Sequence, residues 1–257
     1  MTKYAMDFTD KTVLITGSSR GIGRATAIAF AEAGARVAVH YRSGQEAALE
    51  TLQLMPGDDH LMVKADVANP EQVADMIQTC VQEMGKLDIL VNNAGVFVPH
   101  PIDDCSYEEW QKAWHKTLSI NLTGAANACY CAAQVMIEQG GGRMINVTSR
   151  GAFRGEPDHP AYGASKAGLN SMSQSLALKL GKHGISVYAI APGFVETDMA
   201  KPVLDGPQGD GIRQQSPLGR VAQPEEIAYA ILFYASQPAE FLTGGILDVN
   251  GASYLRS

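Results

Sequence analysis

Val13-Leu-Ile-Thr16 runs directly into Gly17-Ser-Ser-Arg20-Gly21-Ile-Gly23, and this stretch decides the fold. A short apolar strand, a glycine-rich turn and the start of a helix form the unit in which a parallel sheet binds a dinucleotide. Glycines let the backbone turn sharply and approach a pyrophosphate, which then meets the positive end of the helix. We therefore expect a dinucleotide site at the start of a helix over residues 22–33.

Short apolar runs alternate with longer amphipathic ones along the rest of the chain. The predicted strands are 12–16, 36–40, 60–64, 89–91, 144–147, 186–190 and 246–249. The predicted helices include 22–33, 71–84, 107–138, 162–181 and 224–236. Strands that are apolar on both faces and separated by helices indicate a parallel sheet covered on both sides. The expected fold is α/β, a doubly wound parallel sheet (Rossmann fold) that binds ligands at the carboxyl ends of its strands.

Length and composition favour one large domain. A chain of 257 residues, 46% hydrophobic, can bury about three quarters of its unfolded surface, so residues 1–257 are predicted to form a single dinucleotide-binding catalytic domain. Residues 200–215 contain three glycines and two prolines, which cannot sustain a long helix, and we expect a mobile lid over the substrate there. The net charge of -7, with scattered Lys and Arg, argues against nucleic-acid and membrane partners.

The N-terminus and the cysteines indicate a cytoplasmic protein. Residues 1–8 contain no apolar run long enough for a signal peptide, and no 18-residue apolar stretch occurs anywhere. Cys80, Cys105, Cys129 and Cys131 show no metal-ligand spacing and are interpreted as reduced thiols. The six histidines also lack metal spacing, so no metal site is expected.

A candidate acid-base pair lies in Tyr162-Gly-Ala-Ser-Lys166, thirteen residues after Ser149. On a helix, positions four apart share a face, so the phenol and the ammonium are expected to project into the same space. An ammonium close to a phenol favours the phenolate, and we expect Lys166 to lower the pKa of Tyr162. Tyr and Lys pairs at this spacing are common by chance, so the prediction depends on the motifs around them.

The surrounding motifs supply that context. The glycine turn, Asn92-Asn-Ala-Gly95, Asn121-Leu-Thr-Gly, Ser149, the Tyr162 pair and Pro192-Gly193 follow in one order. In this pattern the chain resembles the short-chain dehydrogenase/reductase family from about residue 11 to residue 251. The segments 192–199, 217–220 and 243–245 look most like 3-oxoacyl-acyl-carrier-protein reductases and their relatives of other specificity.

The resemblance implies roles for individual residues. Tyr162 is implied as the acid-base, Lys166 as the residue that tunes it and holds the ribose, Ser149 as a donor to the substrate oxygen, and Asn121 as the holder of a water that links Lys166 to solvent. The implied cofactor-binding residues are Gly17, Ser19, Arg20, Gly21, Ile22, Gly23, Tyr41, Arg42, Ser43, Asp66, Val67, Asn93, Ala94, Gly95, Tyr162, Lys166, Pro192, Gly193 and Thr197. The family also implies a homotetramer paired through the long helices over 107–138 and 162–181.

The end of the second predicted strand bears on which nicotinamide cofactor binds. An NAD enzyme needs Asp or Glu there for the ribose hydroxyl, and an NADP enzyme needs a cation for the 2′-phosphate. This chain has His40, Tyr41 and Arg42, with no acid until Glu46. Arg42 and the turn's Arg20 can clamp a phosphate, to which Ser43 can donate, so NADP is favoured. If both arginines are merely solvated, the enzyme accepts NAD as well.

Two departures from the family pattern are informative. Trp110 and Asn121 are eleven residues apart, about one helical turn more than is usual, so the helix before Asn121 is expected to be extended or bulged. Gln134 and Leu178 stand where carrier-protein-using relatives have docking arginines, and Glu138 lies in a segment that is basic in those relatives. An acidic carrier protein would find little to bind.

Three functions remain open at this level. The first is an NADP(H)-dependent oxidoreductase that transfers hydride between nicotinamide and a ketone or secondary alcohol of a small molecule. The second is a 3-oxoacyl-acyl-carrier-protein reductase of fatty-acid synthesis. The third is a nucleotide-sensing or scaffold protein without turnover, against which the intact Ser149, Tyr162, Lys166 and Asn121 set argues.

Overall fold

The computed structural model describes residues 6–256, so the N-terminal prediction about a signal peptide falls mostly outside the described range. The centre of the molecule is a seven-stranded sheet, parallel throughout, with the order β3-β2-β1-β4-β5-β6-β7. The strands are β1 (Thr12–Ile15), β2 (Arg36–Tyr41), β3 (Leu61–Lys64), β4 (Ile89–Asn92), β5 (Gly142–Val147), β6 (Ile185–Pro192) and β7 (Ile246–Val249).

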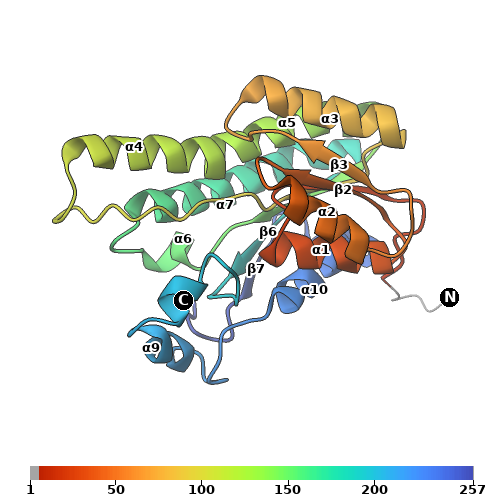
Figure 1. Cartoon of the computed structure of the whole chain (residues 1–257). Helices are drawn as coiled ribbons and strands as arrows, with labels where there is room; N and C mark the ends of the chain where they lie inside the picture. The colour runs from red at the N-terminus through yellow and green to blue at the C-terminus, as the bar shows by residue number, and fades with distance from the viewer. Residues whose placement is uncertain (1–5, 257) are drawn as a thin grey trace.

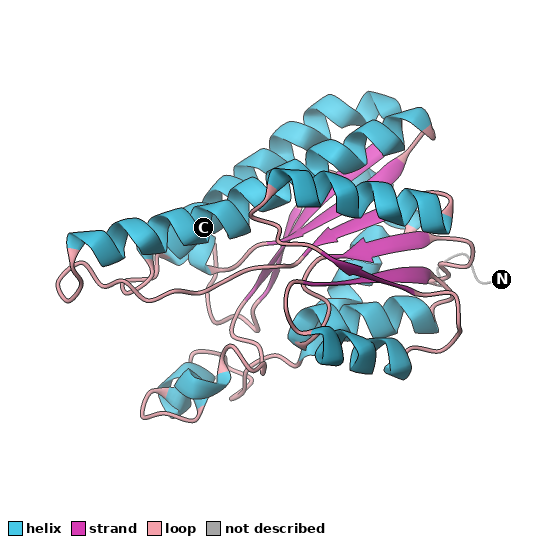
Figure 2. Ribbon diagram, turned by 45° about the horizontal axis from the view of Figure 1, so that its top comes forward, coloured by secondary structure: helices cyan, strands magenta, loops and turns pink. Residues whose placement is uncertain are grey.

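Helices cover both faces of this sheet (Figures 1 and 2). One face is packed by α1 (Gly21–Glu32), α2 (Gln45–Leu54) and α10 (Pro224–Ala235), and the other carries α3 (Pro70–Met84), α4 (Tyr107–Leu118), α5 (Ala125–Glu138) and α7 (Pro160–Leu180). Two separate apolar clusters fill the layers above and below the strands. Within residues 6–256, no helix has the length and apolar character to cross a membrane.

The predicted doubly wound α/β fold is confirmed. All seven predicted strands are present, and their ends differ from the prediction by at most two residues. Helix α2 was not among the predicted helices. Its inward face contributes only Ala48 and Thr51 as buried residues, while Leu49 and Leu54 are exposed, so its sequence carries little apolar periodicity.

The long helix before Asn121 is bulged, as its spacing predicted. α4 continues into a six-residue π-helix, η1 (Ser119–Gly124), and then into α5. A π-helix has a wider turn than an α-helix and is frequent at functional sites. Asn121 lies within this widened segment and is buried.

The segment predicted as a lid forms two short helices, α8 (Lys201–Leu204) and α9 (Gly209–Gln214). They lie apart from the two main helical layers (Figures 1 and 2). Leu204, Ile212 and Val221 form a small apolar cluster of their own here, distinct from the two clusters of the sheet. This separate packing is compatible with movement of the segment, which stays a prediction.

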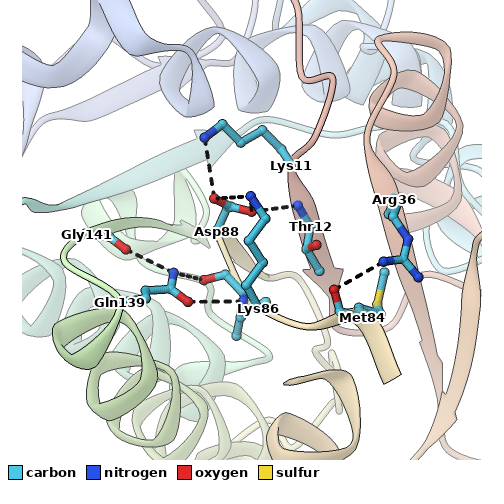
Figure 3. Close-up of polar contacts among 9 residues, drawn as sticks. Lys11, Thr12, Arg36, Met84, Lys86, Asp88, Gln139 and Gly141 are labelled. Carbon is cyan, nitrogen blue, oxygen red and sulfur yellow. Dashed lines mark hydrogen bonds and ion pairs between the residues drawn. The ribbon is translucent and has the colours of Figure 1, made fainter. Parts of the chain in front are cut away.

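Polar contacts tie the amino ends of β1 and β4 together (Figure 3). Asp88, directly before β4, accepts a hydrogen bond of 2.9 Å from the backbone N–H of Thr12. Lys86 and Lys11 lie 3.1 and 3.4 Å from the same carboxylate. Gln139 binds both backbone groups of Leu87, donating to its carbonyl at 2.7 Å and accepting from its N–H at 3.4 Å. The contacts of Asp88 support the register of β1 against β4, and Gln139 ties the end of α5 to the start of β4.

Replacing Asp88 by Ala should lower the free energy of unfolding by about 1–3 kcal/mol, because the buried N–H of Thr12 loses its acceptor. Thermal or urea unfolding measures this change. Asp75→Ala, at an exposed position on α3, is the matched control and should stay within about 0.5 kcal/mol of wild type. Equal stabilities for the two variants would contradict the role given to Asp88.

Candidate active site

The carboxyl ends of β1 and β4 are joined by side chains that bind backbone groups. The hydroxyl of Thr16 accepts hydrogen bonds from the N–H groups of Asn93 and Ala94, each at 3.0 Å. The amide of Asn93 in turn donates to the carbonyls of Thr16 and Gly17, again at 3.0 Å. The glycine turn is therefore fixed to the loop that follows β4.

His40 adds the end of β2 to this arrangement. Its Nδ1 accepts a hydrogen bond from the N–H of Gly17 at 2.8 Å, so Nε2 carries the proton and donates to the carbonyl of Ala65 at 3.0 Å. Burial lowers the pKa of His40, which favours the neutral ring that this pattern requires, although the Ala65 contact opposes the shift. We call Thr16, Gly17, His40 and Asn93 the strand-end clasp. His40 thus positions the glycine turn. The sequence showed only that His40 lies close to Arg42 and did not predict this role.

Gly23 shows how closely the turn is packed. A Cβ at this position would overlap the carbonyl oxygen of Gly17 and lie 2.6 Å from Nδ2 of Asn93. Only glycine therefore allows α1 to begin this close to the end of β1. The free N–H groups at the start of α1 consequently face the space above the strand ends, where they favour an anion.

A cavity of about 450 Å³ occupies that space. Every predicted catalytic and cofactor-binding residue lines it except Gly23 and Asn121. Gly23 acts through the packing of the turn, and Asn121 lies behind the wall. The side chains of Arg20 and Arg42 are exposed and lie among the residues that line the cavity, and Ser149 and Tyr162 line it as well.

Tyr162 and Lys166 occupy successive turns of α7, which Pro160 begins. The ammonium of Lys166 donates to the carbonyl of Val147 at 2.8 Å and lies 5.7 Å from the centre of the Tyr162 ring. Ser149 follows the end of β5, and its hydroxyl accepts from the N–H of Gly151 at 3.0 Å. Three groups that can donate a proton or a hydrogen bond thus surround one end of the cavity.

The expected lowering of the Tyr162 pKa is wrong. Burial raises the pKa of Tyr162 to about 12, and the hydrogen bond with Ser149 opposes this rise only in part. Burial also lowers the pKa of Lys166 to about 8. Both groups lose hydration, which penalises their charged forms, and the Lys166 ammonium is directed to a backbone carbonyl instead of the phenol.

Asn121 is held by the loop after β4. Its Oδ1 accepts from the N–H of Val96 at 2.8 Å, and its Nδ2 donates to the carbonyl of Val96 at 3.0 Å and to the hydroxyl of Ser165 at 3.2 Å. Both amide hydrogens are therefore used. A water bound to this side chain would have to donate to Oδ1. A Cβ built at Gly95 would lie 3.4 Å from Oδ1 and would also lie near the ammonium of Lys166, so both atoms are close to Gly95.

Several residues of the cavity were missed by the sequence reasoning. Arg150 is buried and Glu156 is half-buried, and both line the cavity together with Phe97. The Phe97 ring lies 4.7 Å from the Tyr162 ring and stacks on His159 with centres 3.5 Å apart. No local signal identifies such residues, because their places depend on how the loops after β4 and β5 meet.

Comparison with known proteins places this geometry in a family. A family model described as Enoyl-(Acyl carrier protein) reductase matches residues 17–252. The chain belongs to the short-chain dehydrogenase/reductase family. It is therefore an oxidoreductase that uses a nicotinamide cofactor, and the resemblance inferred from the motifs is confirmed.

Similar proteins have more than one activity. The chain is 37% identical over 246 residues to a 3-oxoacyl-[acyl-carrier-protein] reductase of Synechocystis sp., with 95% of this chain and 96% of that protein covered. It is 38% identical over 249 residues to an L-rhamnose 1-dehydrogenase (NAD(P)(+)) of Sphingomonas sp., with 95% and 96% covered. The crystal structure of gox2181 superimposes with a TM-score of 0.89 at 32% identity and covers 96% of this chain and 97% of that one.

Replacing Tyr162 by Phe should lower turnover by about 10²-fold or more, the usual scale for loss of a general acid. Cofactor affinity should change little, because the strand-end clasp and Lys166 remain. Steady-state kinetics with a reactive ketone and fluorescence titration with the reduced cofactor measure the two quantities. Wild-type turnover in the variant would show that Tyr162 is not the acid-base.

Proposed function

We propose that the protein is an NADP(H)-dependent oxidoreductase that acts on a ketone or secondary alcohol of a small molecule. The observation that carries this proposal is the convergence of Ser149, Tyr162 and Lys166 on a cavity that the glycine turn also lines. A cofactor bound there supplies the hydride. Ser149 and Tyr162 donate to the substrate oxygen, and Tyr162 exchanges the proton with it.

The cavity suits a dinucleotide with an additional phosphate. Its volume lies within the range usual for small-molecule and cofactor sites. Arg20, Arg42 and Ser43 line it, and no carboxylate follows β2 until Glu46. A guanidinium binds phosphate oxygens with charge-assisted hydrogen bonds, which favours NADP over NAD.

Replacing Arg42 by Asp should exchange the phosphate clamp for an acceptor of the ribose hydroxyl. The lost contact and the added repulsion should weaken NADP binding by roughly 2–4 kcal/mol. Dissociation constants for NADP and NAD, measured on wild type and variant, give the preference directly. Arg36→Asp alters another cation and serves as the control, because Arg36 lies at the opposite end of β2. An unchanged NADP to NAD ratio in Arg42→Asp would contradict the assignment.

The names of several relatives favour a second candidate, a 3-oxoacyl-acyl-carrier-protein reductase. The surface of this chain argues against it. Gln134, Glu138 and Leu178 are exposed, and Leu178 retains 90% of its accessible surface. These side chains offer no positive charge to an acidic partner, and the net charge of -7 opposes the encounter.

Small free keto substrates, or thioesters without a carrier protein, should therefore be turned over at least as efficiently as carrier-bound acyl groups. Added salt should not slow the carrier-bound reaction, because electrostatic steering does not assist it. Comparison of kcat/KM for acetoacetyl groups on carrier protein and on a small thiol, at low and high salt, decides between the two. A much higher kcat/KM for the carrier-bound substrate that is lost at high salt would instead support the 3-oxoacyl-acyl-carrier-protein reductase.

We also propose a homotetramer in the cytoplasm. Exposed apolar side chains lie on the long helices, at Tyr107, Tyr130 and Leu178, and near α10, at Tyr229 and Phe241. Apolar groups exposed on more than one face support a protein with more than one subunit interface. Sedimentation equilibrium should give four subunits per particle, and a monomer at micromolar concentration would contradict this proposal.

A further inference from the structure

Glu156 is a half-buried carboxylate whose charge acts on the phenol of Tyr162. It belongs to the loop after the short helix α6 (Gly151–Arg154) and lines the same cavity as Ser149 and Tyr162. Its carboxylate packs against Gly151, where an added Cβ would come within 2.8 Å of Oε1. Since the N–H of Gly151 binds the Ser149 hydroxyl, the carboxylate lies next to the loop that positions Ser149.

The carboxylate of Glu156 has no donor of its own. Among residues 6–256, no hydrogen bond to its oxygens and no ion pair within 4.0 Å is formed. The two nearby guanidinium groups are used elsewhere, since Arg150 donates to Ser253 at 2.6 Å and to Gln215 at 2.7 Å, and Arg154 donates to Gln215 at 3.2 Å. Glu156 lines the cavity, so a ligand bound there can supply a donor, and a hydrogen bond to a charged acceptor strengthens its binding.

The charges around Glu156 restrict that donor. Arg150 and Arg154 act electrostatically on the Glu156 carboxylate, which disfavours an ammonium group on the ligand. An anionic ligand would be repelled by Glu156 itself. A neutral hydroxyl satisfies the carboxylate without adding charge. Because Glu156 lines the same cavity as Ser149 and Tyr162, a hydroxyl near the reacting carbon is the one best placed to reach it.

We propose that Glu156 accepts a hydrogen bond from a substrate hydroxyl adjacent to the reacting carbon, so that the enzyme prefers hydroxylated substrates such as α-hydroxy ketones, vicinal diols and sugars. The inference rests on the proposed function and narrows its substrate class. Glu156 is then the specificity-determining residue. A site built to bind a hydroxyl discriminates against the analogue that lacks it, because the analogue displaces water from the polar group without replacing its hydrogen bond.

Matched substrate pairs test this preference. Wild-type kcat/KM with NADPH should be on the order of 10-fold to 100-fold higher for 1-hydroxy-2-butanone than for 2-butanone. In Glu156→Ala this ratio should fall to about 1, whatever the change in kcat/KM for 2-butanone, and circular dichroism and thermal unfolding show whether the variant is folded. Equal wild-type values for the two ketones, or an undiminished ratio in Glu156→Ala, would overturn the inference.

Two further variants separate contact from charge. Asp158→Asn removes the same charge from an exposed position two residues away and should keep the wild-type ratio. Gly151→Ala leaves Glu156 in place in the sequence but forces its carboxylate away, and should lower the ratio as Glu156→Ala does. Loss of the ratio in Asp158→Asn would attribute the effect to charge at a distance and overturn the contact.

A pH profile gives a readout that loss of a merely structural residue would not produce. Burial, opposed by the Ser149 hydrogen bond, raises the Tyr162 pKa, and the Glu156 charge raises it further. Ser149 and Glu156 act on the phenol, and the Lys166 ammonium lies 5.7 Å from its ring centre. Glu156→Gln should therefore shift the rising limb of the oxidation profile, where Tyr162 loses its proton and becomes the base, to lower pH. An unshifted limb would count against the placement of the carboxylate.

Failure of the proposed function is distinguishable from failure of this inference. If no small carbonyl compound is reduced while carrier-bound acyl groups are, the proposed function fails and the hydroxyl preference fails with it. If small ketones are reduced equally well with and without the hydroxyl, only the role of Glu156 is overturned.

Discussion

The strand-end clasp is the constraint on which the rest of the site depends. A sheet of parallel strands leaves a crevice where the chain order reverses, here between β1 and β4, but the crevice is usable only if the loops around it have fixed positions. His40 and Asn93 provide this by binding backbone groups of Thr16 and Gly17, and the Thr16 hydroxyl binds the backbone of the loop after β4. Because these bonds use side chains, the N–H groups at the start of α1 remain free for a ligand.

Burial then sets the chemistry at the other end of the cavity. Burial raises the pKa of Tyr162 to about 12 and lowers that of Lys166 to about 8, which disfavours a phenolate-ammonium pair. A positive charge brought into the cavity would favour the phenolate, since opposite charges at close range in a low dielectric interact strongly. The acid-base pair is therefore responsive to what occupies the cavity, and Lys166 alone does not tune it.

The sequence predicted the fold and most of the residues that line the cavity, but it did not predict the contacts that those residues make. Strand positions follow from apolar runs, and the bulge before Asn121 followed from a spacing difference, because both are local properties of the chain. The functions of His40 and Glu156 depend on which loops meet above the sheet. The direction of the Tyr162 pKa shift depends on desolvation, which spacing along α7 does not report.

The distribution of charge along the cavity connects the cofactor to the substrate. Cations, Arg20 and Arg42, occur on the glycine turn and the end of β2, and Glu156 belongs to the loop that leads to α7. A dinucleotide brings its negative charge to the turn, where the arginines and the start of α1 stabilise it. On the proposed function, the substrate binds beside Ser149 and Tyr162. A neutral substrate with a hydroxyl would donate to Glu156 without adding charge to the cavity. At the outer surface the exposed Glu138 gives an acidic carrier protein no positive charge to bind, which supports the proposed small-molecule substrate.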